Sequence, residues 1–361
     1  MMSAVRRLGS IAVMACALAL ASCSPSAEEA AEPKTSFKIG WSIYAGWMPW
    51  PYADQAGIVK KWADKYGIDI EIVQVNDYVE SVTQYAAGQL DGVTVANMDA
   101  LTIPAAQGHD TTAIIVGDYS NGNDGVLLKG SDSLPAIKGR QVNLVELSVS
   151  HYLLARALES VDLALTDVRT VNTADADIAG AFTSPDVTAA VAWNPQLTTM
   201  MQVPDAHLVF SSRDIPGEIL DLLVVDTKMI EANPDLGKAL AGIWYETLAL
   251  MEQQDDAGAA ARAAMAELAG TTPEMFDQQL ATTFLYVDPK AAVEATRSPT
   301  LIENMTRVRD FSFAQGLFGQ GATSADAIGM SFPGGKTLGD TNNITLRFDD
   351  SFMQMAAEGA L

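Results

Sequence analysis

The sequence predicts an α/β protein built as two lobes with a ligand cleft between them. Short apolar strands alternate with amphipathic helices, which is typical of α/β folds with a mainly parallel sheet. The alternation begins a second time near residue 126, and an apolar run at residues 220–225 suggests a return to the first lobe. Two crossings imply a hinge, and clefts between domains commonly bind small ligands. The alternative is two unrelated α/β halves that do not close on each other.

The first lobe is assigned to residues 36–125, and its elements follow from side-chain periodicity. Alternating β-branched residues indicate strands, and apolar positions three and four apart indicate helices. Glycines are expected to end several of these helices. The expected strands are residues 37–41, 68–75, 92–96 and 112–116, and the expected helices are residues 52–66, 79–87 and 99–106.

The same periodicities predict a second lobe inserted at residues 126–222, followed by a return segment at residues 223–361. The expected strands of the insert are residues 126–128, 141–145, 168–170, 187–193 and 207–210, and its helices are residues 134–139, 150–160, 174–182 and 196–201. The return segment is predicted to be mostly helical. Its expected helices are residues 233–253, 257–268, 273–281, 299–315 and 351–357, with one strand at residues 343–348.

The N-terminus has the features of a bacterial lipoprotein signal at residues 1–22. Arg6 and Arg7 precede an apolar stretch at residues 11–20, which is too short to span a bilayer. The stretch ends at Cys23, which resembles the lipid-modified residue of a lipobox. A Ser/Ala/Glu/Pro-rich tether at residues 23–35 follows and lacks the apolar content to fold. We therefore expect a periplasmic protein held to the membrane by a lipid; the alternative is an ordinary signal peptide.

Composition limits the classes of partner. The 361 residues include 22 Lys+Arg and 45 Asp+Glu, for a formal net charge of -23, and 48% are hydrophobic. This composition supports a sizeable core but offers no basic patch for nucleic acid. Removing the signal makes the net charge two units more negative. A small cation or neutral molecule is the ligand class that the charge favours, and we expect a monomer.

Motifs for catalysis and metal binding are missing from the sequence. Its two cysteines are Cys16, inside the signal, and Cys23, so the mature protein would have no thiol nucleophile or disulfide. The three histidines have no metal-ligand spacing, and no G-x-S-x-G elbow is present. We expect no enzyme activity, no cofactor and no metal.

The most informative segment is residues 40–53, with the sequence GWSIYAGWMPWPYA. It places three tryptophans and two tyrosines in a Gly/Pro-rich connection between a strand and a helix. Aromatic clusters in loops pack against the core or recognise a ligand. Trp41 and Trp50 are equally well explained by core packing, whereas Trp47 is the better candidate for ligand contact.

The sequence resembles the periplasmic solute-binding proteins of nitrate, sulfonate and taurine ABC importers. The resemblance lies in the segment at residues 40–53 and in three further motifs: GQLDG at residues 88–92, SVSHYLL at residues 148–154 and VAWNP at residues 191–195. The resemblance covers essentially the whole mature chain. It is closest to the urea-carboxylase-associated branch, on the motifs WMPWP at residues 47–51, ANMDAL at 96–101 and GDYSNGNDG at 117–125. It implies a type II-like periplasmic binding protein fold, ABC permease and ATPase partners, and a urea-like or guanidine ligand.

Guanidinium requires an aromatic face and carboxylates in its plane. The loops expected at the cleft supply both kinds of group. The residues expected to contact the ligand are Tyr44, Trp47, Asp99, Asp118, Asp124, Glu146, Ser148, His151, Trp193 and Glu218. Several have structural alternatives: Asp99 as a helix cap, Asp118 and Asp124 as turn residues, and Glu146 as a surface or capping residue.

Other functions remain as alternatives. In the anion-binding relatives, the turn before residues 148–151 offers helix N–H groups to a sulfonate, and here Glu146 places a carboxylate at that turn. No Lys or Arg occurs between Lys65 and Lys129, which disfavours a sulfonate or taurine-like ligand. An enzyme on the same fold is less favoured, because no catalytic set is found. A sensor role is a further alternative.

Overall fold

The computed structural model describes residues 34–361, which form one compact unit. The signal peptide predicted at residues 1–22, the lipidation predicted at Cys23 and the tether up to residue 33 lie outside the described residues. None of the helices in the described part is both long and apolar enough to span a bilayer.

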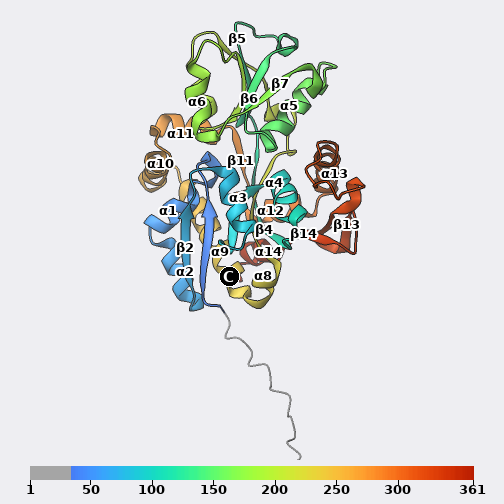
Figure 1. Ribbon diagram of the computed structural model, residues 1–361. Coiled ribbons are helices and arrows are strands. Elements are labelled where there is room, and N and C mark those ends of the chain that lie inside the picture. Colours follow the sequence, from blue (N-terminus) through green and yellow to red (C-terminus); the bar gives the residue numbers. More distant parts are fainter. Residues whose placement is uncertain (1–33) are drawn as a thin grey trace, which may run out of the picture. The chain divides into compact units, whose positions relative to one another are not determined.

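The larger of two sheets contains nine strands and confirms the predicted α/β class (Figure 1). Its order is β13-β12-β14-β4-β10-β3-β1-β2, and β11 pairs with β4 outside this path. The strands are β1 (Ser36–Trp41), β2 (Asp69–Gln74), β3 (Gly92–Ala96), β4 (Thr111–Ser120), β10 (Leu220–Asp226), β11 (Thr283–Leu285), β12 (Gly329–Phe332), β13 (Lys336–Leu338) and β14 (Ile344–Phe348).

Strand direction differs from the expectation of a mainly parallel sheet. β1 pairs in parallel with β2 and β3, but β10 runs antiparallel to both of its neighbours, β3 and β4. The reason is topological. β4 carries the chain out of this sheet towards the second one, and β10 brings it back beside β4 in the opposite direction. The sequence-based expectation also missed β11, β12 and β13, because they are short.

The second sheet has five strands in the order β7-β6-β8-β5-β9. They are β5 (Asp124–Lys129), β6 (Gln141–Leu144), β7 (Arg169–Asn172), β8 (Ala189–Trp193) and β9 (Ala206–Ser211). Side chains alternate between its faces. Leu127 and Ala190 pack in one apolar cluster with residues of α6 and α7, whereas Val126 and Val191 belong to the main core, together with residues of α5. Helices therefore cover both faces of this sheet.

The helices agree with the predicted ones except at particular breakpoints. The α-helices are α1 (Pro49–Gln55), α2 (Ile58–Tyr66), α3 (Tyr78–Ala86), α4 (Asn97–Thr102), α5 (Val149–Glu159), α6 (Asp175–Thr183), α7 (Gln196–Met200), α8 (Thr227–Ala232), α9 (Pro234–Met251), α10 (Asp256–Leu268), α11 (Pro273–Leu280), α12 (Pro289–Arg297), α13 (Pro299–Ala314) and α14 (Ser351–Glu358). The 3-10 turns are η1 (Ala45–Trp47), η2 (Ala105–Gln107), η3 (Leu134–Ile137), η4 (Leu165–Asp167), η5 (Ser212–Asp214), η6 (Ala325–Ala327) and η7 (Pro333–Gly335).

Two expected helices are interrupted where the backbone cannot continue. The helix predicted at residues 52–66 is divided into α1 and α2 at Gly57, whose φ of 74° is left-handed. The helix predicted at residues 99–106 ends after α4 at Ile103, immediately before Pro104, because proline has no amide N–H to continue the helical hydrogen bonds. The sequence analysis missed both α8 and α12.

The two sheets are joined where β4 passes to β5 and where β9 returns to β10. At this junction the Ser120 hydroxyl lies 2.6 Å from the Ser212 hydroxyl, and Ser212 Oγ also accepts from the Gly122 amide at 2.8 Å. A third segment takes part, because the Asn121 amide donates to the Thr282 carbonyl at 2.9 Å. Hydrogen bonds between short polar side chains therefore hold the connecting segments together, a site suited to a hinge.

An ion pair fastens α5 to the returning connection. Glu218 accepts from Arg156 Nε at 2.9 Å and from Arg156 Nη2 at 3.1 Å, and the Tyr152 hydroxyl donates to it at 2.5 Å. The Glu218 side chain is only 10% exposed. A carboxylate buried this far depends on its partners, because removing one of them leaves an uncompensated charge.

We predict that Arg156→Met lowers the free energy of unfolding by about 3 kcal/mol, because Glu218 would stay buried without its cation. Urea unfolding followed by circular dichroism measures this. The control is Glu159→Gln, which removes the exposed acidic partner of the same arginine and should change stability by less than about 0.5 kcal/mol. Equal effects of the two variants would contradict the prediction. The double variant Arg156→Met/Glu218→Met should recover most of the loss.

Candidate functional site

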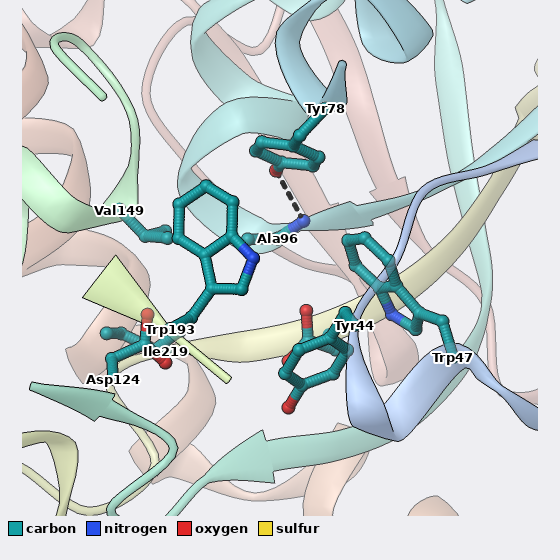
Figure 2. Close-up of a pocket in the computed structure, with 9 residues that line it drawn as sticks. Tyr44, Trp47, Tyr78, Ala96, Asp124, Val149, Trp193 and Ile219 are labelled. Carbon is teal, nitrogen blue, oxygen red and sulfur yellow. Dashed lines mark hydrogen bonds between the residues drawn. The ribbon is translucent and has the colours of Figure 1, made fainter. Parts of the chain in front are cut away.

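Four aromatic side chains form a cage between the two sheets. Trp47 is at the end of η1, after β1, and Tyr44 immediately precedes this turn. Tyr78 begins α3, and Trp193 ends β8 of the second sheet. The ring centres of Trp47 and Tyr78 are 5.7 Å apart, those of Tyr78 and Trp193 are 5.7 Å apart, and those of Tyr44 and Trp47 are 5.0 Å apart. Figure 2 shows Trp47 and Trp193 on opposite sides of the enclosed space.

Gly46 explains why the cage closes at Tyr44. A Cβ at this position would lie 2.4 Å from Cε1 of Tyr44 and 2.8 Å from Oδ2 of Asp118. Only glycine lets the tyrosine ring fold back over the turn while a carboxylate approaches from behind. Pro49, at the first position of α1, then begins the helix that follows this turn.

The cage encloses an empty space of about 320 Å³, its mouth included. Its walls come from both sheets and from the segments between them. The lining residues are Tyr44, Trp47, Tyr78, Ala96, Asp124, Val149, Trp193, Ile219 and Asp221.

Carboxylates surround this cavity. Asp124, the first residue of β5, and Asp221 in β10 line it directly. Asp118 lies behind Tyr44 and accepts a 3.0 Å hydrogen bond from its hydroxyl. Asp124 accepts from the junction residue Ser120 at 2.5 Å. Asp118, Asp124 and Asp221 are each at most 6% exposed.

Burial raises the pKa values of these acids. It raises the pKa of Asp124 to about 6, against a hydrogen bond from Ser120 that lowers it. It raises the pKa of Asp118 to about 7, although hydrogen bonds from Asp221 and Tyr44 oppose this. The pKa of Asp221 is raised well above its ordinary value, by burial and then by the charges of Asp118 and Asp124. Asp118 and Asp221 are register partners of β4 and β10, which places these two buried acids beside each other.

A fourth acid, Asp99, lies behind Tyr78. Its Oδ2 accepts from the Tyr78 hydroxyl at 2.6 Å, and that hydroxyl accepts from the Ala96 amide at 3.1 Å. Asp99 is fully buried, and burial raises its pKa to about 7. It lies in the third position of α4, whose cap is Ala96, so it does not cap that helix.

No basic side chain neutralises this group of acids. Among the ion pairs formed within residues 34–361, none includes Asp99, Asp118, Asp124 or Asp221. Buried carboxylates are normally paired, because burying an isolated charge costs several kcal/mol. The same residues include no group of histidines and acids arranged to hold a metal ion. The site therefore has unbalanced negative potential inside an aromatic enclosure.

Besides Asp99 and Asp118, which lie directly behind cage tyrosines, four residues expected at the site do not line the cavity. Glu146 is half-exposed, accepts from the Thr170 hydroxyl and lines a larger groove outside the cage. Ser148 caps α5, accepting from the Ser150 amide at 3.2 Å. His151 Nδ1 accepts from the Leu147 amide at 3.3 Å. The fourth, Glu218, is neutralised by Arg156, as described above.

Two residues that line the cavity, Tyr78 and Asp221, were not expected there from the sequence. Tyr78 was placed just before a predicted helix and given no role. Asp221 lies inside the apolar run at residues 220–225, where a single acid among leucines and valines is the signal that would have revealed it. By contrast, Tyr44, Trp47, Asp118, Asp124 and Trp193 were expected at the cleft and lie in or directly behind the cage.

Comparison with solved structures defines the fold. The alkanesulfonate-binding protein SsuA from Xanthomonas axonopodis pv. citri, bound to MOPS, matches with a TM-score of 0.67 at 17% identity, over 80% of this chain and 96% of that one. The periplasmic aliphatic sulphonate-binding protein SsuA from Escherichia coli gives 0.66 at 18% identity, over 80% and 94%. The periplasmic nitrate-binding protein NrtA from Synechocystis gives 0.65 at 12% identity, over 90% and 89%.

These likenesses, with a cavity enclosed between two α/β sheets, define a periplasmic binding protein fold, as the sequence predicts. A family model described as NMT1/THI5 like matches residues 56–256. The chain belongs to the NMT1/THI5-like family. A comparison with curated protein sequences finds no match.

The raised pKa values predict a pH-dependent effect of Asp124→Asn on stability. Asp124 holds its proton up to about pH 6 in the folded protein but only to about pH 4 when unfolded. Its ionisation therefore destabilises the fold as pH rises through this interval. The melting temperature of Asp124→Asn minus that of the wild type should increase between pH 4 and pH 7. A difference that is constant with pH would contradict the prediction, and Asp132→Asn, an exposed acid, is the control.

Proposed function

We propose that this protein is the periplasmic solute-binding component of an ABC importer and that it captures a small nitrogen-rich cation, guanidinium or a close analogue, by closing its lobes. Family membership and the fold support a binding role in transport, because the similar solved proteins are named as sulfonate-binding and nitrate-binding proteins. The observation that carries the choice of ligand is the group of buried acids without a basic partner around an aromatic cage.

The chemistry of guanidinium matches both parts of the site. Its planar face stacks on tryptophan, and a stacked contact is worth about 0.5–2 kcal/mol or more when water is excluded. Its rim of N–H groups donates to carboxylates, with the strongest geometry being bidentate. We assign the faces to Trp47 and Trp193 and the acceptors to Asp124 and Asp221, with Tyr44 and Asp118 behind them. A cation also supplies the charge that these acids lack.

Urea has the same shape but no charge, so it leaves the buried carboxylates uncompensated. We therefore place guanidinium ahead of urea. A sulfonate or taurine-like anion is the second candidate, on the strength of the similar solved proteins alone. The negative potential of the cage opposes it, because an anion would add to an unbalanced charge.

The protein that we propose has two lobes, two transport partners and a membrane anchor. Lobe I comprises residues 36–125 and 223–361, and lobe II comprises residues 126–222, with the junction at Ser120 and Ser212 as the hinge. A permease and an ATPase receive the ligand from the closed protein, which acts as a monomer without catalysis or cofactor. Cys23 carries a lipid that holds the protein to a membrane in the periplasm. Mass spectrometry of the mature protein tests this last point.

We predict that isothermal titration calorimetry at pH 8 detects guanidinium binding that is tighter than urea or taurine binding. Asp124→Asn and Trp47→Ala should each weaken it by at least about tenfold, roughly 1.4 kcal/mol, because each removes one type of contact. Asp132→Asn changes charge equally on the exposed surface and should leave affinity unchanged. Tight taurine binding with no response to guanidinium would overturn the proposed ligand while leaving the fold intact.

The affinity for guanidinium should also depend on pH. The cation favours ionised acids, so binding should tighten as pH rises from 5 to 8, through the pKa values of Asp124 and Asp118. Titrations at several pH values in one salt concentration measure this. Affinity that falls with rising pH would contradict the role of these carboxylates.

A further inference from the structure

Tyr78 lies between the cage and a second, larger space. This second space, the outer groove, is lined by residues of α3 and α4 and of the segments that follow β6 and α13. Asp77, which caps α3, and Val79 both line the outer groove, whereas Tyr78 between them lines the cage. The outer groove holds about 1520 Å³ of empty space, its open side included, against about 320 Å³ for the cage.

The Tyr78 side chain is fixed at both ends. Its ring centre is 5.7 Å from that of Trp47 and 5.7 Å from that of Trp193, which it meets edge to face. Its hydroxyl donates to Asp99 Oδ2 at 2.6 Å and accepts from the Ala96 amide at 3.1 Å, the bond drawn in Figure 2. Because the side chain is only 3% exposed, moving it aside would break two buried hydrogen bonds.

Asp99 lies at the far end of this tyrosine and belongs to the outer groove. It lines the groove and not the cage, and it is 0% exposed. Its Oδ1 has no hydrogen-bond partner within residues 34–361. Thr102, one turn later in α4, lines the same groove, and its buried hydroxyl also has no partner in this part of the chain. Two buried polar groups with unused hydrogen-bonding capacity therefore lie along the groove, and one of them touches Tyr78.

The outer groove has the same sign of charge as the cage. Its acidic lining residues are Asp77, Glu80, Asp99 and Glu146, and none of the described residues that line it is basic. A cation long enough to reach from the cage into the groove would therefore find carboxylate acceptors in both spaces. Tyr78 stands in the path of such a ligand, because its ring lines the cage while its hydroxyl contacts a residue of the groove.

We propose that Tyr78 sets the upper size limit of the ligand: it closes the cage against the outer groove, so the protein accepts a small cation that fits within the cage and rejects guanidines that carry a long substituent. The inference rests on the proposed function and narrows its ligand class. A substituent would have to displace a ring packed against two tryptophans and break both of its hydrogen bonds. Selectivity of this kind comes from a steric barrier against the larger competitor.

Removing the ring should join the two spaces. In Tyr78→Ala the Asp99 carboxylate loses its hydroxyl donor, and it can then accept from the ammonium group of a ligand whose guanidinium lies in the cage. Agmatine, in which a chain of four methylene groups joins a guanidinium to an ammonium, is a probe of this shape. Tyr78→Phe keeps the ring and loses only the hydroxyl, so it should keep the barrier.

Calorimetry at pH 8 on the full-length protein, with guanidinium and agmatine as ligands, measures this size limit. We expect the wild type to bind agmatine at least about tenfold more weakly than guanidinium. In Tyr78→Ala the ratio of the agmatine to the guanidinium association constant should rise at least about tenfold, whereas in Tyr78→Phe it should stay within about threefold of the wild-type ratio. Tyr78→Ala/Asp99→Asn should lose most of the gain, which assigns it to the carboxylate.

Tyr85→Ala is the matched control, because Tyr85 is a buried tyrosine of the same helix that lines neither space. Its loss should leave the ratio of association constants unchanged. If Tyr78→Ala is not folded by circular dichroism, Tyr78→Leu, whose side chain is too short to reach Asp99, is measured in its place, and the same change in ratio decides.

The outcomes separate this inference from the proposed function. If the wild type binds guanidinium and the folded Tyr78 variant shows the wild-type ratio, the role of Tyr78 is overturned and the cation site stands. The same conclusion follows if the wild type binds agmatine as tightly as guanidinium. If the wild type binds neither compound, the proposed ligand is overturned, and the size limit falls with it.

Discussion

The burial of four carboxyl groups without a basic side chain beside them is the constraint on which the rest of this structure depends. An isolated buried charge costs several kcal/mol, and proteins avoid it by pairing the charge or by keeping the group protonated. Here burial raises the pKa values of Asp99 and Asp118 to about 7 and that of Asp124 to about 6, and it raises the pKa of Asp221 well above its ordinary value. At the same pH these four acids are therefore closer to neutral than exposed carboxyl groups are.

One of these acids, Asp124, links the cavity to the junction between the two sheets. Asp124 accepts from Ser120, whose hydroxyl also contacts Ser212 on the returning segment. Two hydrogen bonds, one between Ser120 and Asp124 and one between Ser120 and Ser212, thus connect a charged group in the cavity with the segment that returns to the larger sheet. The aromatic cage strengthens this link, because Trp47, Tyr78 and Trp193 keep water away and so raise the strength of every electrostatic interaction inside. Ligand charge and lobe geometry are physically coupled through few groups.

The same scaffold accommodates different ligand charges because the residues at the cleft, rather than the sheets, decide which ions are tolerated. The donors that a helix start offers to an anion are a property of the backbone and are retained in α5. In α5 the Ser148 side chain caps the first turn by accepting from the Ser150 amide. Glu218 does not line the cavity, and its charge is neutralised by Arg156, while the Tyr152 hydroxyl donates to it.

The sequence by itself determined the α/β class, the return of the chain near residue 220, the aromatic connection around Trp47 and the long stretch without Lys or Arg, because these are local patterns of periodicity and composition. Only the tertiary structure decided which acids are unpaired. Arg156 and Glu218 are 62 residues apart, and Asp118 and Asp221 meet because β4 and β10 are neighbours. The antiparallel return of β10 and the hydrogen bond from Tyr78 to Asp99 likewise depend on tertiary packing. No local pattern encodes such contacts, since they arise from how the sheets and helices pack.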